Sequence, residues 1–173
     1  MNALPSPTPH LALLLAIATV MVACDQAVKY ALAAALPLGS SIEVTSWFNL
    51  VHVLNPGAAF SFLANAGGWQ RHFLTILGVT VSGLLLYWLW RGRSSRIETA
   101  AYVSLIGGAL GNVTDRVRIG VVIDYLDFHW RGWHWPAFNL ADVFVVSGAT
   151  LLLLTCILRP NVPPLRAHEE LHR

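Results

Sequence analysis

Asp124 and Asp142 are the residues of this chain best suited to acid/base chemistry. Asp142 lies in Phe138-Asn139-Leu140-Ala141-Asp142, at the start of an apolar run that ends at Leu158. A carboxylate inside a membrane segment costs about 2.5–3.5 kcal/mol on insertion scales, so it is a functional candidate. Two carboxyl groups at one membrane edge can share a proton and supply a general acid and a general base together. The pair suggests hydrolysis of a substrate anchored in the membrane.

The composition is that of a membrane protein. Of 173 residues, 55% are hydrophobic and 12% are charged, whereas roughly a quarter are charged in a soluble domain. A net charge of +2 with scattered arginines excludes a nucleic-acid-binding surface. Cys24 and Cys156 are predicted to lie near opposite membrane faces, too far apart for a disulfide.

Four apolar stretches are long enough to cross a bilayer, which takes about 17–25 helical residues. They cover approximately residues 11–32, 73–90, 97–113 and 140–158. They predict an α-helical integral membrane protein with one domain, residues 1–158. The first stretch also has the length of a signal peptide, and Met21-Val22-Ala23-Cys24 loosely resembles a lipoprotein cleavage box. We expect a retained span, because residues 1–10 lack the basic flank of a signal peptide.

The basic residues orient the spans. The short link between the second and third spans and the segment after the fourth are rich in arginine, so the positive-inside rule assigns both to the cytoplasm. These arginines are Arg91, Arg93, Arg96, Arg159, Arg166 and Arg173. Both termini are then cytoplasmic, and residues 159–173 form a solvated tail.

Two segments are predicted on the outer side. Residues 41–62 are rich in β-branched and aromatic residues, with a turn at Asn55-Pro56-Gly57, and they predict a small hairpin or curled sheet. Residues 114–137 are expected to form an outer loop that carries Asp124.

The unusual polar residues fall at the outer ends of the spans, as a single active site would require. Asp25 and Lys29 are spaced for pairing on one helix face. Lys29 either snorkels to the interface, or orients the outer hairpin, or holds a substrate headgroup. Asp115 and Arg116 are expected to form a buried pair that braces the site.

The remaining polar groups have simpler interpretations. Gly107-Gly108-Ala109-Leu110-Gly111 supplies small residues for close helix packing. Asp127 is expected to be solvated or paired with Arg131. His129 and His134 lack the spacing of a metal site, so we expect neither a metal nor a cofactor. A monomer is expected, because it can bury these polar groups by itself.

The polar motifs together resemble those of one family, the lipoprotein signal peptidases (bacterial signal peptidase II). They occur in order between residues 25 and 142. The motifs are Asp25-Gln26-x-x-Lys29, Asn55-Pro-Gly57-Ala-Ala-Phe60-Ser61, Gly107-Gly-Ala-Leu-Gly-Asn112-x-x-Asp115-Arg116, Val122-Ile-Asp124-Tyr and Phe138-Asn139-x-Ala141-Asp142. One position departs, because the family has Thr where Pro56 stands, and Pro lacks a backbone donor and a hydroxyl.

The resemblance implies an aspartic endopeptidase of the bacterial inner membrane, with four transmembrane helices and a periplasmic β-cradle between the first two. Such enzymes cleave prolipoproteins just before a cysteine that carries diacylglycerol. The implied partners are a lipidated prolipoprotein and membrane lipids, and the implied catalytic pair is Asp124 and Asp142. The implied supporting or substrate-binding residues are Asp25, Lys29, Asn55, Gly57, Gly108, Asn112, Asp115, Arg116, Asn139 and Ala141.

Two other functions are open from the residues alone. A serine protease would use Lys29 to activate Ser61 or another serine on the outer side. A small proton-coupled carrier would use Asp25 and Asp142 as relay groups. The carrier is disfavoured because carriers place such groups near the midplane between repeats, and this chain shows neither feature.

Overall fold

The computed structural model of the protein describes residues 9–57 and 66–158. The helices and strands are α1 (Pro9–Ala35), β1 (Ser41–Thr45), β2 (Phe48–Asn55), α2 (Trp69–Arg91), α3 (Arg96–Arg118), β3 (Val122–Trp130), β4 (Trp133–His134) and α4 (Leu140–Leu158). The predicted tail, Ser61 and residues 58–62 of the predicted β-region lie outside the described residues.

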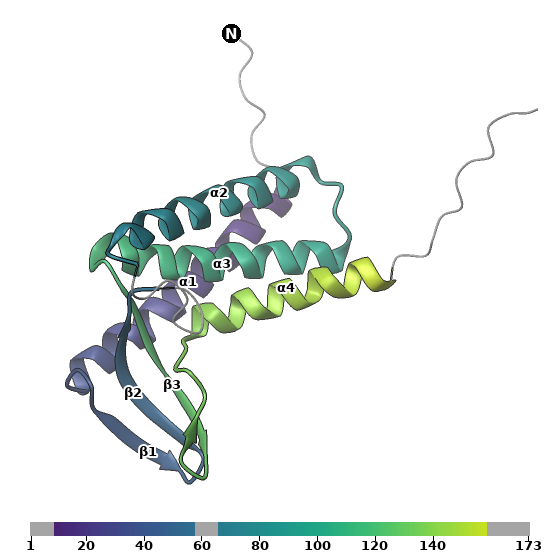
Figure 1. Ribbon diagram of the computed structural model, residues 1–173. Coiled ribbons are helices and arrows are strands. Elements are labelled where there is room, and N and C mark those ends of the chain that lie inside the picture. Colours follow the sequence, from purple (N-terminus) through teal and green to yellow (C-terminus); the bar gives the residue numbers. More distant parts are fainter. Residues whose placement is uncertain (1–8, 58–65, 159–173) are drawn as a thin grey trace, which may run out of the picture.

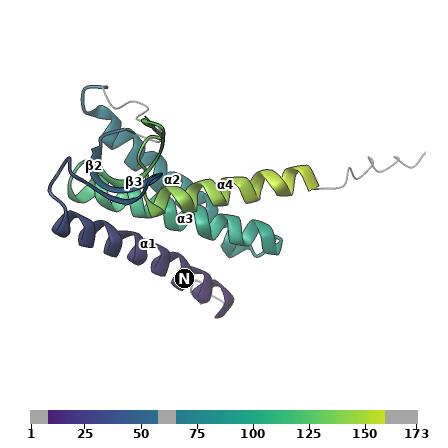
Figure 2. The same ribbon diagram turned by 90° about the horizontal axis from the view of Figure 1, so that it is seen from below.

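The helices form a bundle around α3, and the sheet extends from one end of it (Figure 1). α3 packs against α1, α2 and α4 (Figure 2). Its contact with α4 is close because Gly108 has no side chain: a Cβ there would lie 2.9 Å from the backbone nitrogen of Val145 and against the carbonyl oxygen of Ala141. Gly148 plays the same part on α4, where a Cβ would lie 3.0 Å from the backbone nitrogen of Leu105.

Three helices, α1, α2 and α4, are long and apolar enough to cross a membrane. Their outward faces expose large apolar side chains, among them Leu13, Ile76 and Leu153. α3, the third predicted span, is a helix of 23 residues, but within the described chain it is not among the helices apolar enough to span. Small, polar and charged residues lower the apolar character of α3, and this explains the difference. Many of these residues are buried.

The sequence predicted all four helices to within a few residues at most ends. α1 continues unbroken through Cys24 to Ala35, in accord with the expected helical pattern after the apolar run. α3 extends to Arg118, five residues beyond the predicted end of the span. Both cysteines are free, as their predicted separation required.

Among the described residues, the sheet has four antiparallel strands in the order β1-β2-β3-β4. The prediction of a β-region confined to the connection between the first two helices was therefore incomplete. β3 lies within residues 114–137, which were expected to form a loop, and it pairs along β2, with Val53 opposite Asp124. The β-branched and aromatic residues of β3 suit a strand, but Asp124 and Asp127, which disfavour strands, concealed this tendency in the sequence.

The predicted turn at Asn55-Pro56-Gly57 ends β2 and does not form the β1–β2 hairpin. That hairpin turns at Ser46 and Trp47, where Thr45 pairs with Phe48. After Asn55 the ladder stops because Pro56 has no N–H to donate. The Asn55 side chain instead accepts the N–H of Gly57 at 2.9 Å.

Candidate active site

The two predicted catalytic aspartates meet where β3 passes the beginning of α4. Asp124 lies on β3 and is 2% exposed, and Asp142 lies in the first turn of α4. Both carboxyl groups contact Asn139: its side-chain nitrogen donates to Asp124 Oδ1 at 2.6 Å, and its backbone nitrogen donates to Asp142 Oδ2 at 3.3 Å. The fold thus brings together two carboxyl groups that lie on different elements.

Three asparagine side chains orient these carboxyl groups. Asn55 Nδ2 donates to Asp124 Oδ2 at 2.9 Å, and Asn112 Nδ2 donates to Asp142 Oδ1 at 2.7 Å. Each amide oxygen is occupied by an N–H elsewhere, which fixes the orientation of the amide. That of Asn55 accepts from Gly57, that of Asn112 from Lys29, and that of Asn139 from the backbone of Asp142. The three NH₂ groups must therefore face the carboxylates.

The first turn of α4 positions Asp142. Asn139 caps the helix, because its side-chain oxygen accepts the N–H of Asp142 at 2.9 Å. Asp25, which is fully buried on α1, accepts the N–H of Ala141 at 2.9 Å. Ala141 is itself fully buried, so α1, α3 and α4 converge directly beneath Asp142.

A buried charge cluster lies under the site. Lys29 is 1% exposed and its Nζ contacts Asp25 at 2.8 Å, Asp115 at 2.8 Å and Asn112 Oδ1 at 3.0 Å. All three ammonium donors are thereby used. The interpretation of Lys29 as snorkelling is wrong because a buried, fully paired ammonium does not reach the interface, and the same contacts leave no donor for a substrate headgroup.

Arg116 does not pair with Asp115 as predicted. Neighbouring residues on a helix point in directions about 100° apart, so Asp115 faces Lys29 while Arg116 faces the turn that follows β2. Arg116 Nη2 donates to the carbonyl oxygen of Gly57 at 2.7 Å. Gly57 is thus held through both its N–H and its carbonyl, and Pro56 leaves this turn intact.

Two residues absent from the predicted site support it. Gln26 Nε2 donates to Asp115 Oδ1 at 2.8 Å and to the carbonyl oxygen of Gly111 at 3.1 Å. The hydroxyl of Tyr125, a residue 3% exposed, accepts the N–H of Leu140 at 3.0 Å at the start of α4. Gln26 follows Asp25 and Tyr125 follows Asp124 in the sequence. This adjacency to a predicted site residue is the feature that could have identified them.

Burial controls the protonation of Asp124. Loss of solvent is the main cause that raises the pKa of the Asp124 carboxyl, and the negative charge of Asp142 adds to it, whereas hydrogen bonds from Asn55 and Asn139 lower it. Together these effects raise the pKa to about 7. Asp124 can therefore hold a proton near neutral pH. An acid that is protonated beside a second carboxyl group is the arrangement required for paired acid/base chemistry.

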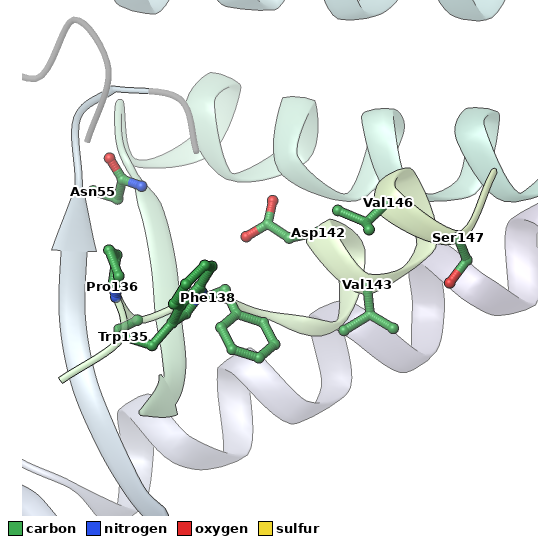
Figure 3. A pocket seen from close by; sticks show the side chains of 9 residues that line it. Asn55, Trp135, Pro136, Phe138, Asp142, Val143, Val146 and Ser147 are labelled. Carbon is green, nitrogen blue, oxygen red and sulfur yellow. The ribbon is translucent and has the colours of Figure 1, made fainter. Parts of the chain in front are cut away.

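A cavity of about 360 Å³ opens beside Asp142. Asp142 extends from the beginning of α4 into the space between Asn55 and Val146, with Phe138 below it in the view of Figure 3. Its lining is largely apolar and consists of Asn55, Trp135, Pro136, Ala137, Phe138, Asp142, Val143, Val146 and Ser147. Such a cavity suits a substrate with apolar groups next to the bond that reacts.

The other acids and histidines of β3 form a separate cluster. Asp127 is 6% exposed, accepts from Asn49 at 2.9 Å and contacts His134 at 2.9 Å, so the expectation that it is solvated or paired with Arg131 was wrong. Its place opposite Asn49 in the β2–β3 register explains the difference. Among residues 9–57 and 66–158, no group of three or more His, Cys, Asp or Glu side chains is arranged to hold a metal ion.

Comparison with known proteins identifies clear relatives. The family described as Signal peptidase (SPase) II matches residues 17–158. The lipoprotein signal peptidase of Aeromonas hydrophila subsp. hydrophila is 53% identical over 132 residues, which are 75% of this chain and 79% of that protein. The lipoprotein signal peptidase of Paraburkholderia phytofirmans is 51% identical over 140 residues, 81% of each protein.

The fold also has solved counterparts. A bacterial membrane enzyme determined by the in meso method at 2.3 Å resolution matches with a TM-score of 0.75 and 30% identity, over 84% of this chain and 88% of that one. A second, at 1.9 Å, matches with a TM-score of 0.73 and 29% identity, over 86% of this chain and 95% of that one.

Proposed function

This chain belongs to the signal peptidase II family, and we propose that it is an aspartic endopeptidase that removes signal peptides from lipid-modified prolipoproteins. The observation that carries the proposal is the convergence of Asp124 and Asp142 on Asn139, beside a largely apolar cavity. In this function Asp124 and Asp142 are the catalytic residues. The bond cleaved is the one just before the cysteine that carries diacylglycerol.

The mechanism needs one proton shared by the two carboxyl groups. The ionised carboxylate takes a proton from a water molecule, which attacks the scissile carbonyl carbon, while the protonated carboxyl donates to the carbonyl oxygen. A proton then passes to the leaving amine, and the peptide bond breaks without a covalent intermediate. A pKa of about 7 for Asp124 supports the presence of that proton near neutral pH.

The supporting residues have separate roles in this proposal. Asn55, Asn112 and Asn139 orient the carboxyl groups through their NH₂ donors. Lys29, placed between two buried carboxylates, fixes the oxygen of Asn112. The remaining supporting residues hold the elements that carry the site, and they are Asp25, Gly57, Gly108, Asp115, Arg116 and Ala141.

The proposed topology has four membrane spans, with α3 as the third, and both termini in the cytoplasm. α3 would tolerate its polar residues because α1, α2 and α4 pack around it. The link from Arg91 to Arg96 lies at the end of the bundle away from the sheet (Figure 1). The positive-inside rule then favours a cytoplasmic link, and a sheet and site on the periplasmic side of the bacterial inner membrane. The protein would act as a monomer, with residues 1–158 as one domain.

The substrate's lipid would restrict it to the membrane and help to set the site of cleavage. Lipid chains held in the bilayer bring the peptide bond to a fixed depth, so the encounter with the aspartates becomes effectively intramolecular. The cavity beside Asp142 has an apolar part, which includes Val143 and Val146 on α4. In this proposal that part receives apolar groups of the lipidated substrate. The alternative serine protease is disfavoured, because a Lys29 ammonium paired with two carboxylates is a poor base.

The test is cleavage of a purified diacylglyceryl prolipoprotein by Asp124→Asn and Asp142→Asn variants. Each is expected to lose turnover by at least about 10²–10⁴-fold, because an amide keeps the size of the carboxyl but cannot exchange its proton. Asp127→Asn is the matched control, since it makes the same change at another buried acid of β3, and we expect it to keep most of the activity. Near-normal turnover by either dyad variant would refute the proposal.

A further inference from the structure

A second cavity lies at the opposite end of the helices from the proposed active site. It has a volume of about 360 Å³ and lies between the last turn of α2, the link and the first turns of α3. Its lining includes Tyr87, Trp88, Arg91, Arg93, Glu98 and Tyr102. The α2–α3 link is at the end of the bundle remote from the sheet (Figure 1).

Arg91 and Arg93 place two positive charges in this cavity, against the one carboxylate of Glu98. Within the described residues, neither Arg91 nor Arg93 forms an ion pair. Arg91 instead lies over the ring of Tyr87, 5.8 Å from its centroid, and its Nη1 is 3.4 Å from the Tyr87 hydroxyl oxygen. Two guanidinium groups therefore line one cavity with donors that an anion can use.

The acid in the cavity is already engaged. The Glu98 carboxylate accepts the N–H of Ser95 at 2.8 Å, while the Ser95 hydroxyl accepts the N–H of Glu98 at 3.2 Å. This reciprocal cap satisfies donors at the start of α3. Glu98 thus serves the helix end, and the two arginines outnumber it, so the cavity lining carries a net positive charge that favours an anion.

The position of the cavity identifies the kind of anion. α2 is long and apolar enough to cross a membrane, and the cavity adjoins its last turn. Trp88 and Trp90 are exposed there, at 48% and 52%, as aromatic residues are at the level of lipid headgroups. Arginine is well suited to phosphate because its planar fork donates two parallel hydrogen bonds.

We propose that this cavity binds the phosphate of an anionic membrane phospholipid. The lipid's chains would lie along the apolar surface of α2, and its phosphate would contact Arg91 and Arg93. A bound lipid would hold the link that joins α2 and α3. This inference does not depend on the identity of the catalytic residues.

The experiment is a lipid titration of the delipidated full-length protein in detergent, followed by native mass spectrometry. The probes are phosphatidylglycerol, phosphatidylethanolamine and inorganic phosphate. We expect phosphatidylglycerol to bind more tightly than phosphatidylethanolamine, and millimolar phosphate not to displace it. Each of Arg91→Gln and Arg93→Gln should weaken phosphatidylglycerol binding by about fivefold, the usual contribution of one basic residue at a membrane surface.

Arg131→Gln is the matched control. Arg131 lies at the β3–β4 turn and, like Arg91, contacts an aromatic ring, 6.0 Å from the Trp130 centroid. It should leave phosphatidylglycerol binding unchanged. An equal loss in this control, equal affinity for the two lipids, or displacement of the lipid by phosphate would each overturn the proposal. Arg93→Gln alone decides the matter if Arg91→Gln unfolds, since Arg93 lies exposed in the link.

Discussion

Replacing Asp124 by asparagine should change how the stability of the folded protein depends on pH. Burial raises the pKa of Asp124 from 3.8 to about 7. A carboxyl whose pKa is raised by folding binds its proton more tightly in the folded chain. Its contribution to stability is therefore full below pH 3.8 and is lost as the pH rises towards 7. An asparagine side chain does not titrate in this range, so the Asp124→Asn variant should not lose stability in this way as the pH rises.

The magnitude follows from the distance between the working pH and the pKa of about 7. Between pH 5 and the pKa of about 7, only the folded chain holds the proton of Asp124. Raising the pH from 5 to 8 therefore lowers the free energy of unfolding by about 3 kcal/mol. In a domain of this size, that is a fall of about 6–12 °C in melting temperature. Asp124→Asn should reduce the fall by that amount, whatever its effect on stability at a single pH.

The assay is thermal unfolding of the purified protein in detergent, followed by tryptophan fluorescence between pH 5 and pH 8. Glu43→Gln is the control, because it removes an exposed carboxylate from the same sheet, and it should keep the pH dependence of the wild type. If Asp124→Asn and the wild type lost stability in parallel over this range, then Asp124 would not hold a proton near neutral pH. The proposed sharing of a proton by the dyad would then lose its support.

Three further outcomes are expected from thermal unfolding in detergent. Gly108→Ala forces α3 away from α4 and should lower the free energy of unfolding by about 1–3 kcal/mol. Gly83→Ala, where a Cβ meets no atom within 4 Å, should not destabilise the protein, and equal melting temperatures for the two variants would contradict the packing argument. Lys29→Met leaves buried carboxylates without a counter-charge and should cost about 3–5 kcal/mol, partly restored by adding Asp25→Asn; an additive double variant would show that the pair is not coupled. Ser95→Ala removes the cap of α3 and should cost about 1 kcal/mol with prolipoprotein cleavage unchanged; loss of cleavage at full stability would contradict a purely structural role.

The predicted helices were largely correct because their signals are local. Apolar runs of sufficient length form α1, α2 and α4, and these runs can be read without knowing what surrounds them. The polar residues at the outer ends of the helices can likewise be recognised from the sequence alone, because each lies at the end of an apolar run. The helical segments determine the level at which each polar side chain lies along its helix, and their threading placed Asp142 and the loop that carries Asp124 on the same side of the membrane in the prediction.

The errors concern partners that are distant in sequence. Asp115 was assigned to Arg116, its neighbour, but the fold pairs it with Lys29. Residues 122–130 were assigned to a loop, but the edge of β2 makes them a strand. A strand or an ion pair forms only where a partner is available, and short sequence patterns do not reveal which partner lies opposite.

The sequence by itself determined that this is a helical membrane protein of the signal peptidase II family, with two candidate aspartates at one level. Only the tertiary structure decided how those aspartates are held. The contact of Asp25 with the N–H of Ala141 joins residues 116 positions apart, and each asparagine amide is oriented by the partner of its own oxygen. The physical reason is that burial and hydrogen-bond direction depend on several packed elements at once, whereas helix length and apolarity are properties of a single segment.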